Sequence, residues 1–460
     1  MRTLIFYSFF LIVSTSFSQD FKFSQQLIPS QSKQNLKFGF NVVQNQSYVH
    51  IGNPNLYANK GGVSIYKKNE NNALLLDTIL SPLNYSGQFG SKIAIYDSLL
   101  LVKLQYDTIM LYEEINSEWV FKLKFNIVNE TIYKLVLIDN MIIITAADAN
   151  SNKGRVYIYK INSTNVELSQ ILESNNPFSF EKFGMNAAIS PNKQVLAIGS
   201  YNNSIFIYQY IDSTWNYSQT LISESDLADA FGTFLEINNK FLLAGDWGYN
   251  NNRGAINIYE KSIHNTWVKI KDVLNPRGHI DEFYGNSVSI SDSTFVIGAP
   301  AYSFEFEDYN GFVHVLQKNG NQWLSQIISP QNLKHDDEFG GRVSIHKNNL
   351  LISAPYSDSL YENSGSVYVY QRDTTTGVFN LQSPLANNFS VYPNPSNHTI
   401  TVRFSKQTNN KKLSLYNSLG QLVLKQLVNS NMATIPVTHL PNGVYHLRYN
   451  TQVETVIVNH

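Results

Sequence analysis

The chain has 460 residues, more than one ordinary hydrophobic core accommodates, so two or three domains or one large repeat array are expected. Hydrophobic residues make up 43% and charged residues 15%, with a formal net charge of −1, which excludes a disordered polyelectrolyte and an electrostatic nucleic-acid-binding protein. The 28 Tyr and 27 Phe favour an all-β fold, and the absence of Cys excludes disulfides, thiolate metal sites and cysteine nucleophiles.

The N-terminus predicts an export signal. Arg2 precedes the apolar run Leu4–Val13, and small polar residues follow up to Ser18, which is the order typical of a secretory signal peptide. The run is about half the length that a membrane-spanning helix needs. We therefore expect a signal peptide at residues 1–18, cleavage between Ser18 and Gln19, and no transmembrane segment in the mature chain.

The middle of the chain repeats about every fifty residues. An aromatic-glycine pair marks each unit, and a degenerate copy fills one gap; the pairs are Phe38-Gly39, Phe89-Gly90, Ile132-Tyr133 (degenerate), Phe183-Gly184, Phe231-Gly232, Tyr284-Gly285 and Phe339-Gly340. Each pair precedes short apolar segments that alternate with period two, as strands with one buried face do. Four such segments per unit predict a seven-bladed β-propeller over residues 19–385.

Two segments could supply the strand that closes such a ring. The segment Phe23–Ser30, "FSQQLIPS", closely echoes Trp323–Pro330, "WLSQIISP", which opens the fourth strand of its own unit. The alternative is Val378–Pro384, "VFNLQSP", which follows the last repeat. We interpret the N-terminal segment as the closing strand and leave the second segment open.

Over residues 38–370 the repeat resembles the FG-GAP family, the unit of integrin α-chain propellers and of many bacterial surface proteins. The resemblance rests on the aromatic-glycine pairs, on Gly298-Ala299-Pro300 and Ser353-Ala354-Pro355, and on a closing strand that ends at Tyr370. Family members often hold calcium in an Asp-rich loop. The corresponding loops here are too short and too poor in carboxylates to wrap a cation, so no cofactor is expected.

One loop is a weak metal candidate, because it presents oxygen-bearing side chains at alternate positions: Asp148, Asn150 and Asn152. It lacks the downstream Glu that would complete a calcium loop. An ordinary Asx-rich turn is therefore the interpretation that we prefer.

Acidic residues also gather just before the aromatic-glycine pairs: Glu181, Asp226, Asp229, Asp281, Glu282, Asp336, Asp337 and Glu338. If the units superimpose, these carboxylates lie at one end of the ring, where they could attract a cation or a basic partner. Because they recur in most units, we favour a repeated structural cap over a functional site.

Nothing in the repeats matches a catalytic constellation. The repeats contain only Arg155, Arg253, Arg277 and Arg342, fewer than a sialidase-type carboxylate clamp suggests, and no metalloprotease, serine-hydrolase or phosphate-loop motif occurs. We expect a secreted or cell-surface protein that binds a protein or glycan without catalysis. The alternative is a hydrolase of glycans or lipid head groups, which would need two carboxylates about 5–10 Å apart.

From Phe389 onward a different pattern predicts a small antiparallel β-sandwich over residues 386–460. It is similar to the type A C-terminal sorting domain of the type IX secretion system of Bacteroidetes. The similarity rests on blocks in the same order: Tyr392-Pro393-Asn394-Pro395, Leu415-Tyr416-Asn417, Leu419-Gly420-Gln421 and Leu440-Pro441-Asn442-Gly443-Val444-Tyr445. The resemblance implies that the type IX machinery is a partner, that the sorting domain is removed, and that the cargo is released or attached to surface lipopolysaccharide.

Overall fold

The computed structural model describes residues 20–460 apart from 31–32, 57–59, 70–72, 83–87, 106, 128–129, 175–180, 225–229, 302–309, 331–332, 335, 374–388, 405–410, 418–420 and 450–451. The predicted signal peptide, its cleavage site at Ser18 and Gln19, and the alternative closing strand at 378–384 lie outside the described residues. The chain divides into two compact units, Met1–Thr374 and Thr375–His460.

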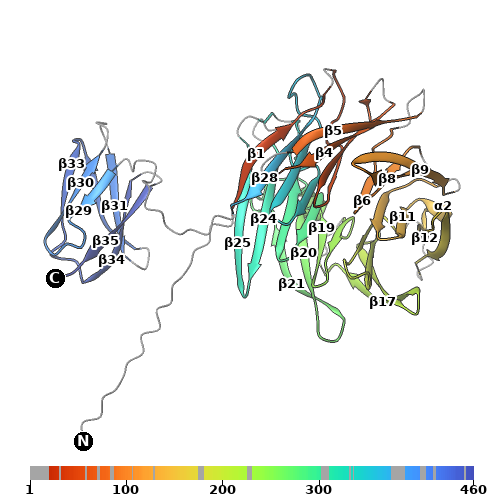
Figure 1. Cartoon of the computed structure of the whole chain (residues 1–460). Helices are drawn as coiled ribbons and strands as arrows, with labels where there is room; N and C mark the ends of the chain where they lie inside the picture. Colours follow the sequence, from red (N-terminus) through yellow and green to blue (C-terminus); the bar gives the residue numbers. More distant parts are fainter. Residues whose placement is uncertain are drawn as a thin grey trace, which may run out of the picture. The chain divides into compact units, whose positions relative to one another are not determined.

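The described strands of the first unit form seven antiparallel sheets of four strands (Figure 1). We number the sheets in chain order. Their strands are, for sheet 1, β2 Asn41–Gln44, β3 Tyr48–Asn53, β4 Gly62–Lys68 and β5 Ala73–Leu80; for sheet 2, β6 Ile93–Tyr96, β7 Leu99–Lys103, β8 Thr108–Ile115 and β9 Glu118–Asn126; for sheet 3, β10 Lys134–Ile138, β11 Met141–Ala146, β12 Arg155–Ile161 and β13 Val166–Leu172; for sheet 4, β14 Asn186–Ile189, β15 Val195–Gly199, β16 Ser204–Ile211 and β17 Thr214–Ile222; for sheet 5, β18 Phe234–Ile237, β19 Phe241–Asp246, β20 Ala255–Lys261 and β21 Trp267–Leu274; for sheet 6, β22 Ser287–Ser291, β23 Thr294–Ala299, β24 Phe312–Asn319 and β25 Gln322–Ile328; and for sheet 7, β26 Val343–His346, β27 Asn349–Ala354, β28 Ser366–Arg372 and β1 Phe21–Leu27. Two single-turn helices, α2 Ala149–Asn152 and α3 Tyr249–Asn252, precede β12 and β20.

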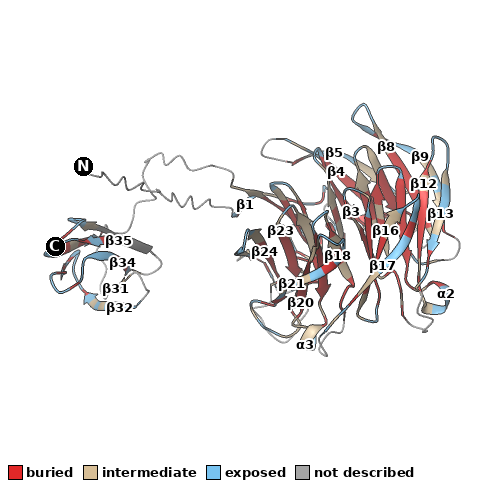
Figure 2. Cartoon of the chain, turned by 90° about the horizontal axis from the view of Figure 1, so that it is seen from below, coloured by how far each residue is buried: buried red, intermediate tan, exposed pale blue. Residues whose placement is uncertain are grey.

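The sheets form a closed ring. The first strand of each sheet contacts the first strand of the next, in the series β2, β6, β10, β14, β18, β22, β26, and β26 contacts β2 again. These short strands therefore surround the centre of the ring. Second strands such as β3 and β11 are buried throughout, whereas fourth strands such as β13 and β17 carry exposed faces (Figure 2). The expectation of an all-β propeller is confirmed.

The N-terminal strand closes the ring, as the sequence echo predicted. The strand β1 pairs with β28 in antiparallel register, from Phe21 opposite Arg372 to Leu27 opposite Val367 (Figure 1). Phe21 and Leu27 are each only 3% exposed, so this strand contributes to the core as well as to the sheet. The two ends of the ring-forming segment thus share one sheet.

The aromatic-glycine pairs join consecutive sheets. Their aromatic rings are fully buried, and Phe38 forms a parallel bridge with Gly365, which connects sheet 7 to sheet 1. The glycines have positive φ angles; at Gly90 (φ 86°) an added Cβ would lie 2.5 Å from the carbonyl oxygen of Gly62. The motif therefore supplies a ring that fills the gap between sheets and a backbone position that only glycine tolerates.

A second device joins sheets at the outer rim, and sequence reasoning missed it. The fourth strands of four sheets each carry a glutamine that bonds to one residue in the fourth strand of the next sheet. The glutamine amide donates to the backbone carbonyl of that residue and accepts from its backbone N–H. We call these pairs the glutamine clamps: Gln25 with Ala73, Gln170 with Trp215, Gln219 with Trp267, and Gln326 with Phe21, at 2.8–3.2 Å. Two of them involve the closing strand β1.

The second unit has a core shared by two sheets, as in a β-sandwich. One sheet has the order β29 Phe389–Tyr392, β30 Thr399–Phe404, β33 Met432–Pro436, and the other has the order β32 Leu422–Val428, β31 Lys411–Asn417, β34 Gly443–Tyr449, β35 Gln452–Val458. Ile400 and Ile435 of the first sheet and Leu415 and Leu447 of the second are all fully buried in this core. Among the described residues of the whole chain, no helix has the length and apolar character to cross a membrane.

Candidate functional site

The innermost strands present one residue per sheet at an equivalent register position. In each sheet this residue pairs with an equivalent residue of the second strand; for example, Lys134 pairs with Thr145 and Phe234 pairs with Gly245. In sheets 2 and 7 the equivalent contacts are backbone hydrogen bonds from Lys103 to the carbonyl of Lys92 and from Ser353 to that of Arg342, each 2.9 Å. The seven residues, from sheet 1 to sheet 7, are Asn41, Lys92, Lys134, Asn186, Phe234, Ser287 and Arg342.

Side chains from this position meet across the ring. The guanidinium carbon of Arg342 in sheet 7 lies 5.8 Å from the ring centroid of Phe234 in sheet 5, although sheet 6 separates these sheets along the ring. The charges of Arg342 and Lys134, from sheets 7 and 3, both lower the pKa of Lys92 in sheet 2. Contacts between non-neighbouring sheets require these side chains to face the centre.

We call Lys92, Lys103, Lys134 and Arg342 the central cation cluster. Burial, together with repulsion from the other three cations, lowers the pKa of Lys92 to about 7. Burial also lowers the pKa values of Lys134 and Lys103, and Lys103 is only 8% exposed. Within the described part of the chain, none of the three lysine ammonium groups has a hydrogen bond or an ion pair. Positive charge is therefore concentrated here, and the three lysines have no ion pair among the described residues.

Two carboxyl groups lie near the cluster. Burial raises the pKa of Glu236, which lies two residues after Phe234, to about 7, and Lys134 acts in the opposite direction. Burial raises the pKa of Glu338 to about 7 as well, opposed by Arg342 and Lys37. Each carboxyl group thus interacts with different cations. Among the described contacts, none joins the two into the acid pair that a glycosidase needs.

The acidic residues before the aromatic-glycine pairs do not converge. Glu181 and Glu282 are buried within their own loops, and the amide of Asn275 donates to Glu282 Oε2 at 2.7 Å. Asp337 is also buried and accepts from the backbone N–H of Lys334 at 2.9 Å. Asp226 and Asp229 lie outside the described residues. Glu181, Glu282 and Asp337 therefore serve their own loops, whereas Glu338 lies near Arg342 and Lys37.

The loop that carries the weak metal candidate is a left-handed turn. Asn150 and Asn152 have positive φ angles, and Asp148 accepts a 2.7 Å hydrogen bond from the Tyr133 hydroxyl and pairs with Lys182 at 3.2 Å. The turn at α3 repeats the same backbone in sheet 5. Among the described residues, no cluster of three His, Asp or Glu side chains could hold a metal ion. A cation at Asp148 stays a prediction.

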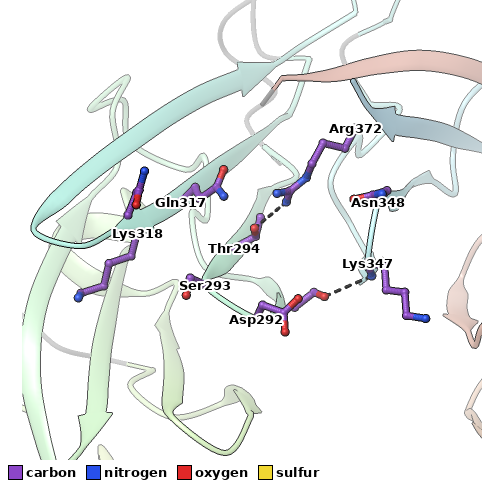
Figure 3. Close-up of a pocket in the computed structure, with 10 residues that line it drawn as sticks. Asp292, Ser293, Thr294, Gln317, Lys318, Lys347, Asn348 and Arg372 are labelled. Carbon is purple, nitrogen blue, oxygen red and sulfur yellow. Dashed lines mark hydrogen bonds between the residues drawn. The ribbon is translucent and has the colours of Figure 1, made fainter. Parts of the chain in front are cut away.

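A polar groove of about 350 Å³ lies between sheets 6 and 7, at the end of the ring opposite the aromatic-glycine pairs (Figure 3). Arg372 donates to the Thr294 hydroxyl at 2.6 Å, and its guanidinium lies 5.0 Å from the Phe21 ring. The backbone N–H of Lys347 donates to the Ser291 hydroxyl at 3.2 Å. Arg372 thus connects the closing strand to sheet 6, and we interpret the groove as part of the closure.

The described sorting-signal residues lie in turns of the second unit or at the ends of its strands β29 and β34. Asn394 accepts from the backbone N–H of Ile457 at 2.7 Å, and Asn442 accepts from that of His460 at 2.8 Å. Gln421 donates its backbone N–H to Asn417 at 2.9 Å, and the Tyr445 hydroxyl donates to the Pro441 carbonyl at 2.9 Å. The motif amides therefore hold turns together, while Tyr392 is 43% exposed. Leu419 and Gly420 lie outside the described residues.

Comparison with known proteins agrees with this architecture. Residues 390–459 match the model of the secretion system C-terminal sorting domain, and residues 324–370 match that of the FG-GAP repeat. The β-propeller domain of Cps50 (Swd1) from Myceliophteria thermophila is similar in structure, with a TM-score of 0.53 at 10% identity, over 76% of this chain and 99% of that domain. No curated protein matches.

The chain therefore carries an FG-GAP repeat within a β-propeller and a type IX secretion sorting domain, which directs it to the cell surface or the exterior. The central cation cluster was not predicted from the sequence, because Arg342 stood there as one of four scattered arginines and the lysines were not compared by strand register. The sequence does hold a signal: the residue at the start of each unit's first strand, or directly before it, is Lys or Arg in three units only.

Proposed function

We propose that this protein is a secreted or cell-surface binding protein, in which the propeller is the cargo and residues 386–460 are the sorting signal. One observation carries the binding role: cations from three sheets gather at the centre of the ring, at a register position whose residue differs from sheet to sheet. A site that departs from the repeat is expected to serve function, since the architecture itself does not demand it. The partner is a protein or a glycan.

Export is tested by deletion and by transfer. Removal of residues 389–460 should leave the propeller inside the outer membrane, in a host with a functional type IX system, as measured by cell fractionation. Fusion of residues 386–460 behind a signal peptide and a soluble reporter should carry the reporter out. Normal surface display of the deleted chain contradicts the sorting role.

Binding is tested with the chain that begins at residue 19. Glycan arrays and pull-downs with surface proteins should identify a saturable ligand. Failure to bind any glycan or protein contradicts the proposal. The control is a chain with Lys193→Met, because this surface lysine lies in the turn between β14 and β15 and already pairs with Asp139 at 2.7 Å.

One observation favours the hydrolase alternative. Glu236 and Glu338 both have pKa values raised to about 7, which suits a general acid at neutral pH. If the protein is a glycosidase, Glu236→Gln or Glu338→Gln should abolish release of reducing sugar from polysaccharide substrates, while Glu224→Gln at the exposed rim should not. Turnover that requires either carboxyl group would replace the non-catalytic proposal.

A further inference from the structure

We propose that the centre of the ring binds an oxyanion group, which is a sulfate, phosphate or carboxylate of the ligand, between Lys92, Lys134 and Arg342. The inference rests on the proposed binding function and names the chemistry of its ligand. Nothing in the family resemblance or the structural similarity assigns a site at this place.

Positive charge at this register position is confined to one side of the ring. Lys92, Lys134 and Arg342 occupy the same register position in sheets 2, 3 and 7, so they lie on one arc, with only Asn41 of sheet 1 between them. The remaining positions carry no positive charge. Three like charges that converge on one arc are costly in a folded protein unless a ligand or counter-ion compensates them.

The three lysines of the cluster make no described ion pair, although Glu236 acts on Lys134 electrostatically. Surface lysines find carboxylates, as Lys193 does with Asp139 at 2.7 Å and Lys269 with Glu224 at 2.8 Å. Among the described residues, Lys92, Lys103 and Lys134 have no such partner, although Lys103 is 92% buried. An ammonium group offers three donors, and a tetrahedral or planar oxyanion can accept from several cations at once.

Two contacts fix the orientation of the Arg342 side chain. Its Nη1 donates to the carbonyl of Gly341 at 2.6 Å, and its guanidinium lies 5.8 Å from the ring of Phe234. These contacts hold the guanidinium at the centre before any ligand arrives, which reduces the entropy lost on binding. Phe234 adds an apolar surface against which the carbon skeleton of an anionic ligand can pack.

Three groups at the centre change their charge near neutral pH, so anion affinity should depend on pH. Lys92 titrates at a pKa of about 7, beside Arg342, Lys134 and Lys103, and Glu236 and Glu338 titrate near 7 beside Lys134 and Arg342. As the pH rises through 7, Lys92 loses its positive charge and both carboxyl groups gain negative charge. Anion affinity should therefore fall as the pH rises from 6 to 8.5.

The experiment is isothermal titration of the chain from residue 19 with sodium sulfate, sodium phosphate and sodium galacturonate, at ionic strength held constant with chloride. We expect saturable binding of at least one probe at pH 6, weaker at pH 8.5. Lys92→Met and Lys134→Met should each reduce the affinity about tenfold, and Lys193→Met should leave it within about twofold. Circular dichroism checks that each variant is folded.

Several results would overturn the inference. One is the absence of saturable binding by all three probes; another is binding that survives the double variant Lys92→Met/Lys134→Met unchanged. If a glycan or protein ligand found on the arrays still binds that double variant, the binding function stands and only the oxyanion site fails. A preference for sulfate, phosphate or galacturonate identifies the group on the natural ligand.

Discussion

The rim and the centre of the ring differ in how closely the sheets repeat one another. At the rim, Gln170, Gln219 and Gln326 make the same pair of hydrogen bonds to the next sheet, and the N-terminal strand joins the series through Gln25. At the centre, one register position carries amide, hydroxyl, aromatic and cationic side chains in different sheets. Repetition at the rim reflects the requirements of assembly, whereas variation at the centre marks a site that assembly leaves free to vary.

The rim and the centre of the ring also differ in how far their polar side chains are hydrogen-bonded. Each glutamine clamp uses both atoms of the side-chain amide and both polar groups of one backbone residue. The lysines of the central cation cluster have no described partner, and burial shifts their pKa values downward. The rim should therefore contribute stability, and the centre should cost stability in the absence of ligand.

The largest effect is expected at the closure of the rim. Leu27→Ala in β1 should lower the free energy of unfolding by about 2–5 kcal/mol, because it removes a buried side chain and leaves a cavity beside β28. Guanidinium denaturation of the chain from residue 19 measures it. Phe23→Ala, at a site 57% exposed, is the control and should cost less than about 1.5 kcal/mol. Equal effects of the two variants would show that β1 does not close the core.

A smaller loss is expected from a clamp. Gln219→Ala leaves the backbone N–H and carbonyl of Trp267 without their partners and should cost about 1–2 kcal/mol. The control is Gln209→Ala, which removes an exposed bond to Ser218 and should cost less than about 0.5 kcal/mol. A clamp variant no less stable than its control contradicts the role given to the rim.

At the centre of the ring, a substitution is expected to stabilise the protein instead of destabilising it. Lys92→Met should stabilise the ligand-free protein by about 1 kcal/mol at pH 6, since it removes a half-buried charge that repels three neighbouring cations. The pKa of Lys92 is lowered from 10.5 to about 7, so the wild type loses stability as the pH falls from about 10.5 to 7, and the variant lacks this loss. Thermal unfolding at pH 6, 8 and 10 measures the difference, with Lys193→Met alongside. Destabilisation by Lys92→Met would mean that this charge already has a partner.

The smallest effect concerns Glu236. Its pKa is raised from 4.5 to about 7, so the wild type should lose stability as the pH rises from about 4.5 to 7, where the unfolded carboxyl ionises more readily. Glu236→Gln removes this dependence and should change stability by less than about 1 kcal/mol, because Lys134 loses an attractive neighbour at the same time. Melting curves at pH 4.5, 6 and 7.5 give the slope, and parallel curves for wild type and variant would contradict the pKa shift.

Much of the fold could be predicted from the sequence, because its determinants are local. Alternating strands need one apolar face, Gly90 and its equivalents need a left-handed backbone, and each signal recurs within a few residues of its neighbours. The closing strand was also predictable, since Ser24-Gln25 and Ser325-Gln326 occupy equivalent places in the echo between Phe23–Ser30 and Trp323–Pro330. The bonding role of those glutamines was not, because their partners lie in the next sheet.

The candidate site was less predictable. Asp148 stood out in the sequence because its neighbours alternate, yet in the structure it binds Tyr133 and Lys182. Lys92, Lys134 and Arg342 are separated by tens to hundreds of residues, and their shared place at the start of a unit's first strand does not by itself show that they converge. Only the register of each innermost strand reveals that they are equivalent.

The sequence alone determined the class of fold and the sorting domain, since repetition and short motifs encode them in neighbouring residues, and it offered two candidates for the closing strand, of which the structure shows β1. The tertiary structure decided where charge accumulates, because closure of the ring converts one position in each of seven distant segments into a single ring of side chains. Coulomb interaction depends on distance in space and not along the chain. The near-zero net charge of the whole chain therefore conceals a positive centre.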